Sequence, residues 1–342
     1  MASTQGTSDW ITERTSMSLD TGADRHLWEG GRRYHAYREG RYSLPNDEIE
    51  QQREELMHIL VMDILDQELF LAPMAEPPLK VMDLATGIGL WAIESKQSLP
   101  INLNSSKAML TAMALVGDRY PDANILGIDL SPIQPTSVPP NVTFQVDDVE
   151  DTWVHDNDYD FIHMREASGY MRSTPTVIES VIAHLKTGGW LELQEFHWVA
   201  EKEDGTVDPN IPVNRYMDHM MSAAATSEGR KIPIVPEIGD IMKKAGFVDI
   251  KKTIYRVPYG TWPTDPVARR RGAVLSVNAE LLLPTSDKVL GYIGVTPEQA
   301  EALYSDCVKM FHDSSIHCYA TYYVWYGRKP EEATDNLGGT DR

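Results

Sequence analysis

The sequence has little cysteine and no long apolar run. Its 342 residues include two cysteines, Cys307 and Cys318, and no Cys-x-x-Cys pair, so neither a disulfide framework nor a zinc site of common spacing is expected. No stretch approaches the ~18 apolar residues that span a bilayer, and the N-terminus carries no apolar signal segment. These absences favour a soluble protein of a reducing intracellular compartment, and we expect it in the cytoplasm rather than at a membrane.

Positive charge is also scarce. Lys and Arg number 31 against 51 Asp and Glu, giving a formal net charge of −20. Such a polyanion repels a phosphate backbone, so no nucleic-acid partner is expected. The one dense group of cations consists of Arg32, Arg33, Arg38 and Arg41. No set of His, Cys and Asp residues has metal-ligand spacing, so no metal is expected either.

What is present is an alternation of short apolar runs with helical patterns. Strands are predicted at 79–84, 125–129, 142–146, 159–163, 190–194, 248–257 and 319–326. Helices are predicted from residue 47 onward and at 176–186, 236–245, 266–283 and 297–311. This alternation predicts an α/β fold with a doubly wound, mostly parallel sheet.

The same patterns suggest five segments. Residues 1–25 and 331–342 are polar and predict disordered tails. Residues 26–75 form a lid and a first helix, which begins at an Asp47 and Glu50 pair that resembles a capping box. Residues 76–200 form a cofactor-binding core. Residues 201–330 form a helical cap together with the last two strands, and a polar loop is expected directly after Glu195.

A strand that runs into small residues and then into a helix lies at Val81-Met-Asp83-Leu-Ala85-Thr-Gly87-Ile-Gly89-Leu. Small residues let the backbone approach a ligand, and a helix N-terminus offers free N–H groups. Gly87-x-Gly89-x-x-Ala92 also satisfies a dinucleotide fingerprint. The Asp83 carboxylate, however, would repel a pyrophosphate and suits a ligand with an ammonium and a sulfonium. The turn thus favours S-adenosyl-L-methionine over NAD, with a turn that merely packs as the alternative.

Acidic residues also follow the next two predicted strands. Asp129 ends the second strand, where a carboxylate can accept hydrogen bonds from both ribose hydroxyls. Asp147 and Asp148, followed by Val149, come after the third strand, where a carboxylate can accept from an adenine amino group. Each Asp alone is more often a cap or loop residue, but together with Asp83 they predict a nucleoside site. Gly89 and Asp129 are 40 residues apart, whereas ~20 are expected.

Several strings spread over residues 26–330 carry a family resemblance. They are Glu29-Gly-Gly-Arg-Arg-Tyr34-His, Leu44-Pro-Asn-Asp47-Glu, Asp83-Leu-Ala-Thr-Gly87-Ile-Gly89-Leu-Trp91-Ala-Ile, Asp129-Leu-Ser131-Pro-Ile-Gln134-Pro, Val138-Pro-Pro-Asn141-Val, Asp147-Asp148, Gly188-Gly189-Trp-Leu-Glu192-Leu-Gln194-Glu195 and Tyr326-Gly-Arg-Lys-Pro330. Together they resemble the LaeA-like fungal methyltransferases, a class I branch that uses S-adenosyl-L-methionine. One departure is Ala85, where the family usually has its first glycine, and we expect the extra methyl to tighten the fit rather than abolish binding.

The resemblance implies a Rossmann-like, seven-stranded sheet with an N-terminal helical lid and a C-terminal helical cap. It also implies that S-adenosyl-L-methionine is the cofactor and that Tyr34 belongs to the lid over it. The expected cofactor-binding residues are then Tyr34, Asp83, Ala85, Gly87, Gly89, Asp129, Leu130, Asp147, Asp148 and Val149.

The surplus between Gly89 and Asp129 maps to an insertion near 95–116. The family runs almost directly from Trp91-Ala-Ile-Glu94 to a Gly-Asp-Arg-Tyr-Pro-like turn. Ser95-Lys96-Gln97 can be encoded with an intron donor, and Leu115-Val116 with an acceptor. We hypothesise that about 21 residues are a retained intron, whose removal restores the expected spacing, with a tolerated surface loop as the alternative. Residues 96–106 should be irregular, and transcript sequencing decides between the two.

The acceptor side is harder to predict. Methyl transfer from a sulfonium needs alignment and exclusion of water, and a base only where the acceptor must lose a proton. Glu195 and His197 follow the strand 190–194 at the ligand-binding edge of such sheets, which makes them candidate catalytic residues. His197 is the candidate base or positioning group, with a solvated or core-capping histidine as the alternative. For Arg165, after the fourth strand, a structural salt bridge is expected.

We expect Tyr259, Trp262 and the helices between about 266 and 312 to cap the acceptor, although aromatics there are more often core. The leading hypothesis is an enzyme that methylates a small molecule of fungal secondary metabolism. The alternative is a LaeA-like nuclear regulator that acts through a protein partner, which the net charge of −20 and the lack of a basic localisation run disfavour. An NAD-dependent oxidoreductase is disfavoured by Asp83.

Overall fold

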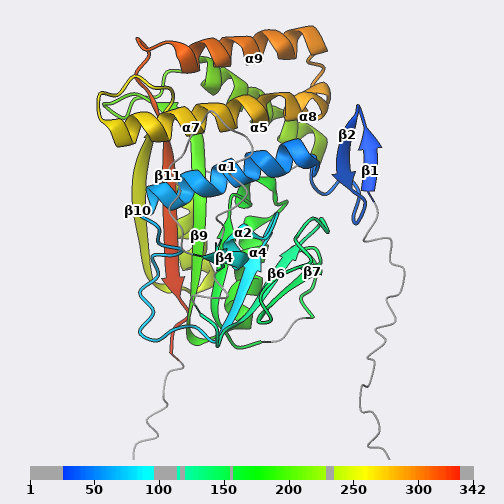
Figure 1. The fold of residues 1–342 in the computed structure, drawn as a ribbon, viewed down its shortest axis with the longest axis vertical. Coiled ribbons are helices and arrows are strands. Elements are labelled where there is room, and N and C mark those ends of the chain that lie inside the picture. The colour runs from blue at the N-terminus through cyan, green and yellow to red at the C-terminus, as the bar shows by residue number, and fades with distance from the viewer. Residues whose placement is uncertain (1–25, 96–113, 116–119, 155–156, 229–234, 332–342) are drawn as a thin grey trace, which may run out of the picture.

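The computed structural model describes residues 26–95, 114–115, 120–154, 157–228 and 235–331. Its centre is a seven-stranded sheet with the order β10-β11-β9-β8-β3-β6-β7 (Figure 1). The strands are β3 (Lys80–Leu84), β6 (Asn124–Asp129), β7 (Val142–Val146), β8 (Tyr159–Arg165), β9 (Leu185–Glu201), β10 (Val248–Pro258) and β11 (Tyr319–Arg328). Neighbours from β9 to β7 are parallel, and β11 is antiparallel to β9 and β10. The predicted doubly wound, mostly parallel sheet is therefore confirmed.

One strand differs strongly from its prediction. β9 was expected at 190–194 but spans 17 residues, so the polar loop expected directly after Glu195 is wrong. The extension has a partner, because β11 pairs with β9 as far as Tyr319 opposite Glu201. At its start the strand includes residues 186–189, and helix α4 (Thr174–His184) ends at His184 instead of at the glycine pair.

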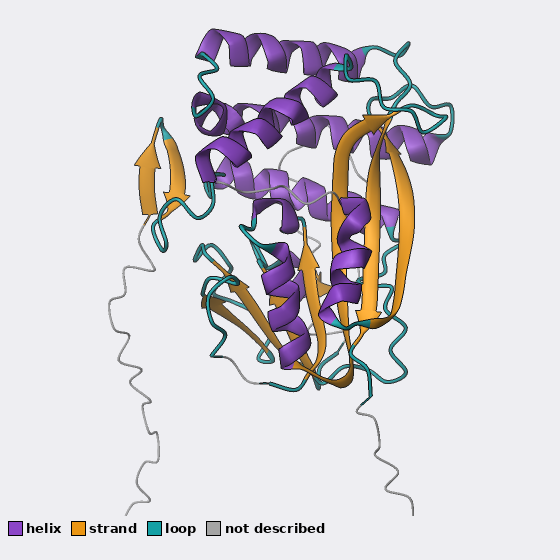
Figure 2. Ribbon diagram, turned by 180° about the vertical axis from the view of Figure 1, so that it is seen from behind, coloured by secondary structure: helices purple, strands orange, loops and turns teal. Residues whose placement is uncertain are grey.

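Two helices, α4 and α6 (Ile238–Ala245), pack on one face of the sheet (Figure 2). Because side chains alternate along a strand, Tyr323 and Trp325 of β11 point to this face. α6 ends at Gly246, which adopts the left-handed conformation with φ 101° and lets the chain turn into β10. The helix and its glycine stop agree with the sequence pattern.

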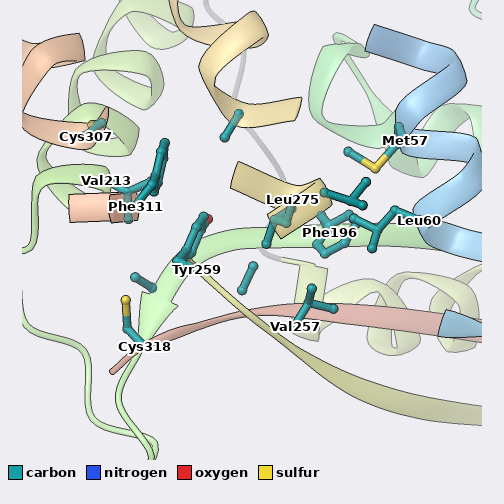
Figure 3. Close-up of a cluster of buried hydrophobic side chains, with 14 of the residues drawn as sticks. Met57, Leu60, Phe196, Val213, Val257, Tyr259, Leu275, Cys307, Phe311 and Cys318 are labelled. Atoms are coloured by element: carbon teal, nitrogen blue, oxygen red, sulfur yellow. The ribbon is translucent and has the colours of Figure 1, made fainter. Parts of the chain in front are cut away.

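The other face is covered near the long strands by α1 (Glu48–Ile64), α5 (Pro212–Glu228), α7 (Pro266–Leu282) and α9 (Pro297–His312), with the short helices η4 (Leu283–Ser286) and α8 (Asp287–Gly291) between the last two. Figure 3 shows side chains of this core, among them Phe196, Val257 and Leu275. α7 and α9 lie in the expected C-terminal cap, α5 joins them without having been predicted, and α1 is the expected first helix. No helix of the described residues is both long and apolar enough to cross a membrane.

The N-terminal part differs from the helical lid that the resemblance implies. Residues 26–35 form a hairpin of β1 (His26–Glu29) and β2 (Arg32–His35), closed by a two-glycine turn. Two glycines with positive φ suit such a tight turn. Asp47 caps α1 by accepting a hydrogen bond from Glu50 N at 3.2 Å, and it also pairs with Arg32 of the hairpin at 2.5 Å. The predicted lid region thus begins with a hairpin that is tied to the first turn of α1, and α1 is the first helix expected there.

The helix after the glycine turn is short. α2 comprises only Leu90–Ile93, and the chain then enters a two-residue pairing of β4 (Glu94–Ser95) with β5 (Ala114–Leu115). Residues 96–113 and 116–119 lie outside the described part of the chain, as do the predicted tail at 1–25 and all of the predicted tail at 331–342 except Glu331. The hypothesis of a retained intron therefore stays a prediction.

The strand order places a crevice beside β3. From β3 the chain moves to β6 and β7 on one side, and then to β8 and β9 on the other. In an open α/β sheet, ligands bind outside the carboxyl ends of the strands at this reversal. Leu84, Asp129 and Arg165 end the three strands concerned.

Two glycines offer a matched test of how α7 is seated. A Cβ on Gly272, in α7, would lie 2.0 Å from the carbonyl oxygen of Gly260, whereas a Cβ on Gly291, at the exposed end of α8, would meet nothing within 4 Å. We expect Gly272→Ala to lower the free energy of unfolding by roughly 1–3 kcal/mol, since backbone must move. Gly291→Ala should change it by less than ~0.5 kcal/mol. Urea unfolding measures both, and equal midpoints would contradict this packing.

Candidate active site

A cavity opens where the carboxyl ends of β3, β6 and β8 meet. Its empty space of about 1250 Å³ includes the open solvent at its mouth, and pockets at such a strand edge are the usual place for a small ligand. We call it the cofactor cavity. It is lined by the turn after β3, the loops after β6, β7 and β8, and α1 with the segment before it, including Arg41, Tyr42, Asn46, Arg53, Glu54, His58, Asp83, Ala85, Gly87, Asp129, Leu130, Asp147, Asp148, Val149, His163, Arg165, Glu166 and Tyr170.

The turn after β3 presents its backbone to this cavity. Gly87 has a φ of 58°, and a Cβ there would lie 2.6 Å from Glu54 Oε2, so a larger residue would displace the Glu54 carboxyl. Ala85 holds a φ of 52°, a left-handed conformation that costs a non-glycine residue roughly 1–2 kcal/mol. Gly89 was expected to touch the cofactor, but it does not line the cavity. It lies against Phe144, whose Cζ would be 2.5 Å from a Cβ at this position.

Asp83 lines the cavity but turns both carboxylate oxygens to protein partners. Its Oδ1 lies 2.8 Å from Nδ1 of the fully buried His163, and its Oδ2 accepts from Thr86 Oγ1 at 2.5 Å. The His163 ring stacks on Trp91 with centroids 3.8 Å apart. The expected direct contact with a cationic ligand therefore stays a prediction, while the buried negative charge beside the cavity is present.

Asp129 joins the end of β6 to the glycine turn. Its Oδ2 accepts from Gly87 N at 2.9 Å and its Oδ1 from Ser131 N at 2.8 Å. Burial raises the pKa of Asp129 to about 6 in spite of these donors. Each oxygen keeps a second lone pair, so the carboxylate can still accept from ribose hydroxyls.

The predicted adenine side of the cavity contains Leu130, Asp147, Asp148 and Val149. Asp148 is buried and forms an ion pair with Arg41, whose Nε lies 2.6 Å from Oδ2. This pair ties the segment before α1 to the loop after β7. Asp147 bonds to the backbone N of Asp148 at 2.8 Å.

Tyr34 is placed away from the cavity. It lies in β2, does not line the cofactor cavity, and its ring faces Lys288 Nζ at 5.1 Å. The prediction that Tyr34 covers the cofactor is therefore not supported by its position. Tyr42 and Asn46 take the corresponding place, because the segment that leaves the hairpin passes over the cavity before α1 begins.

Sequence reasoning missed Glu54 and gave Arg165, a second charged residue of the cavity, only a structural role. Glu54 on α1 accepts a hydrogen bond from Ile88 N at 3.1 Å, and burial with the nearby Glu50 carboxylate raises its pKa to about 8. Arg165 bonds to His58 at 2.7 Å, and its Nη1 is buried without a partner among the described residues. The expected salt bridge of Arg165 is absent from the ion pairs of this part of the chain. No sequence motif marks Glu54, because it is one of several carboxylates on α1.

These residues fit S-adenosyl-L-methionine, the cofactor that the resemblance implies. The unpartnered guanidinium nitrogen of Arg165 suits a carboxylate. The carboxyl groups of Glu54, Asp83 and Asp129 line the cavity. A bound ammonium or sulfonium would favour their ionised forms, whereas a pyrophosphate would be repelled by them. The described residues contain no group of three or more His, Cys, Asp or Glu that could hold a metal ion.

A second cavity lies beside the first, and we call it the acceptor cavity. It is lined mostly by apolar and aromatic side chains from β9, α5, α7, η4 and α9 and from the segments before α1 and after β10. They include Leu44, Phe196, Trp198, Val213, Tyr216, Met217, Met220, Tyr259, Leu283 and Phe311. Figure 3 shows Phe196, Val213, Tyr259 and Phe311 among the core side chains. Glu166 and Tyr170 line both cavities.

The two predicted catalytic residues face this second cavity. Glu195 accepts from Ala167 N at 3.3 Å and Ser168 N at 3.0 Å, and burial raises its pKa to about 7. His197 Nδ1 is buried without a hydrogen-bond partner, 4.0 Å from Glu201, and burial lowers the pKa of this histidine. A neutral His197 can therefore contact an acceptor, whereas neither residue lines the cofactor cavity.

Of the two aromatic residues expected to cap the acceptor, only one lines the acceptor cavity. Tyr259 lines the acceptor cavity and donates its hydroxyl to the Trp198 carbonyl at 2.7 Å. Trp262 lines neither cavity and stacks on His317 with centroids 4.2 Å apart. Cys307 and Cys318 are both free and buried in the same core.

Comparison with known proteins gives one family and several relatives. The family described as a methyltransferase domain matches residues 50–252. The methyltransferase pytC of Aspergillus terreus is 36% identical over 322 residues, which cover 93% of each chain. The protein-methionine methyltransferase laeA of Emericella nidulans is 29% identical, covering 88% of this chain and 76% of its own. The secondary metabolism regulator laeA of Aspergillus flavus is 28% identical, covering 88% and 77%.

Solved structures match only at low similarity. The phosphoethanolamine N-methyltransferase 2 of Haemonchus contortus in complex with S-adenosyl-L-methionine is 15% identical with a TM-score of 0.41, covering 82% of this chain and 53% of its own. The YcgJ protein of Bacillus subtilis is 13% identical with a TM-score of 0.39, covering 81% and 99%. These identities and TM-scores are too low to assign a role to any residue of this chain.

Removing the Asp129 carboxylate should weaken cofactor binding. Asp129→Ala leaves Gly87 N and Ser131 N without their acceptor, and each lost buried partner costs ~1–3 kcal/mol. We expect the Kd for S-adenosyl-L-methionine, measured by calorimetry, to rise at least ~10-fold. Asp240→Ala, on the exposed side of α6, should leave it unchanged. An unaltered Kd in Asp129→Ala would show that this carboxylate does not organise the site.

Glu54 should also make the stability of the ligand-free protein depend on pH. Its pKa is about 8 in the folded protein and about 4.3 when unfolded, so the folded state holds an extra proton between these values. The stability that this proton provides is present below the unfolded pKa and is lost as pH rises through the folded pKa. Glu54→Gln should match the native protein at pH 5 and exceed its unfolding free energy by roughly 2 kcal/mol or more at pH 8. Glu301→Gln, at an exposed position, is the control, and parallel pH curves for Glu54→Gln and the native protein would contradict this assignment.

Proposed function

Because this chain belongs to the methyltransferase-domain family and its cofactor is S-adenosyl-L-methionine, we propose that it methylates a small apolar molecule bound in the acceptor cavity. The observation that carries this proposal is the pair of adjoining cavities with a shared wall at Glu166 and Tyr170. One cavity is rich in carboxylates, and the other is lined by aromatic and methionine side chains. A cationic donor and an apolar acceptor would thus meet at the wall.

The chain's part in such a transfer is placement and protection from water. When bound, S-adenosyl-L-methionine supplies a methyl group already activated on a sulfonium. The acceptor cavity supports an in-line approach, because residues from the long strands and the cap helices surround it on several sides. Apolar surroundings also keep water from competing for the methyl group.

The relatives support the methyl-transfer activity and point to two kinds of acceptor. The 36% identity to pytC extends over nearly the full length of both chains, and pytC is a methyltransferase by name. The laeA relatives, at 28–29% identity, favour a second candidate, a nuclear regulator that methylates or binds a protein. The two candidates differ in location, because the regulator would act in the nucleus. We propose that this chain is cytoplasmic, and a fluorescent fusion protein tests that location.

The acceptor class can be tested with a tritiated methyl group on S-adenosyl-L-methionine. The purified protein is incubated with the low-mass and the protein fractions of an extract from its own organism. We expect label in an organic-soluble, low-mass product. Label confined to protein, with none in the low-mass fraction, would overturn the small-molecule proposal in favour of the regulator.

A variant that fills the acceptor cavity serves as the matched control. Met217 lines that cavity on α5 and is only partly buried, so Met217→Trp should occupy acceptor space without unfolding the protein. We expect low-mass labelling to fall at least ~10-fold, while the Kd for S-adenosyl-L-methionine stays within about twofold, because the change costs binding only in the second cavity. Full labelling in this variant would place the acceptor elsewhere.

A further inference from the structure

The wall between the two cavities contains a residue for which the sequence offers no motif. Glu166 follows β8 directly and has a φ of 52°. A left-handed conformation costs a glutamate of order 1 kcal/mol or more, and such strain persists where the surrounding structure fixes it. Here it turns the side chain into the wall, where it lines both the cofactor cavity and the acceptor cavity.

The backbone strand beside it holds this carboxyl in place. Glu166 N donates to the Gln194 carbonyl at 3.0 Å, and Glu166 Oε1 accepts from Phe196 N at 2.6 Å. Glu195, between these two residues, accepts from the backbone of the loop that follows Glu166. These bonds fix one carboxyl oxygen of Glu166 at the wall.

The charges around Glu166 keep it near the point of ionisation. Burial and the adjacent Glu195 carboxylate raise the pKa of Glu166, while Arg53 and Arg165 lower it. Glu195 ionises first of the pair, because two backbone N–H groups bond to its carboxylate. The titratable and charged groups that face Glu166 are Glu195 on β9, Arg53 on α1, Arg165 on β8, Tyr170 after β8 and Tyr322 on β11.

We propose that Glu166 is the proton acceptor of the methyl transfer, and that the positive charge of the bound cofactor first converts it to its ionised form. This inference rests on the proposed function, since the methyl group must face the acceptor cavity for transfer to occur. The sulfonium would then lie at the shared wall, beside Glu166. A positive charge within ~4–6 Å favours an ionised carboxyl.

The assigned step conserves atoms and charge. The hydroxyl oxygen of the acceptor forms a bond to the methyl carbon, and the carbon–sulfur bond breaks with its electron pair left on sulfur. The hydroxyl proton passes to the Glu166 carboxylate. One positive and one negative charge are lost together, so no uncompensated charge remains in the apolar site. The site therefore selects acceptors that carry a dissociable proton, such as a phenolic or enolic hydroxyl.

The test measures protons released on ligand binding and does not require the acceptor. Calorimetry with S-adenosyl-L-methionine and with S-adenosylhomocysteine, in phosphate and in Tris at pH 7.5, gives the number released by each. Both ligands carry the ammonium and the carboxylate, and only the first carries the sulfonium. Because burial and the Glu195 carboxylate raise the pKa of Glu166, part of it is still protonated at this pH in the ligand-free protein. We expect S-adenosyl-L-methionine to release roughly half a proton more than its demethylated product.

Glu166→Gln should abolish this difference, because the amide keeps an acceptor for Phe196 N but cannot release a proton. Glu54→Gln is the matched control, since Glu54 is a second carboxyl of the same cavity with a raised pKa of about 8. It should change the release for both ligands alike and leave their difference intact. A difference that survives in Glu166→Gln, or that disappears in Glu54→Gln, would overturn the assignment.

A second measurement needs no variant. The preference for S-adenosyl-L-methionine over S-adenosylhomocysteine, as a ratio of Kd values, should rise at least roughly threefold from pH 6.5 to 8.5, because proton release and binding are linked. A ratio independent of pH would contradict the inference. Failure of the native protein to bind either ligand would instead overturn the proposed function itself.

Discussion

The rest of the structure depends on one feature, a set of carboxyl groups that are buried at one edge of the sheet. Glu54, Asp129, Glu166 and Glu195 all have raised pKa values, because burial opposes their ionised forms. Ionising these buried acids near neutral pH lowers the free energy of unfolding unless a bound cation compensates their charge. A positively charged cofactor offsets that cost, and its binding should stabilise the folded state in turn.

Much of the fold could be predicted from the sequence, because short apolar runs and glycine stops are local signals. The strand order and the turn after β3 follow from that pattern, and Asp83 and Asp129 were placed at the right strand ends. The extent of β9 was not predicted, because residues 195–201 are held in the sheet by pairing with β11, far along the chain. Helix α5 was missed for a similar reason, since its buried residues contact elements that the sequence does not place nearby.

In the candidate site, too, some residues could be predicted from the sequence and others could not. Residues on the glycine turn and the strand ends were predictable, since chain direction alone brings them to one edge. Tyr34 was misplaced because a two-glycine hairpin carries it away from the cavity. Glu54 and Glu166 could not be found, because one belongs to a helix with several acids and the other depends on a left-handed backbone that its sequence does not signal. The acceptor cavity is assembled from distant elements, which explains why its residues carry no common motif.

The proposed transfer requires that the cation of the cofactor lies at the wall shared by the two cavities. A crystal structure of the complex with S-adenosyl-L-methionine tests this most directly. It should show the ribose at Asp129, the amino-acid carboxylate at Arg165, and the methyl group directed past Glu166 into the cavity lined by Phe196 and Tyr259. A methyl group that points to bulk solvent or to the side of the glycine turn would contradict the claim.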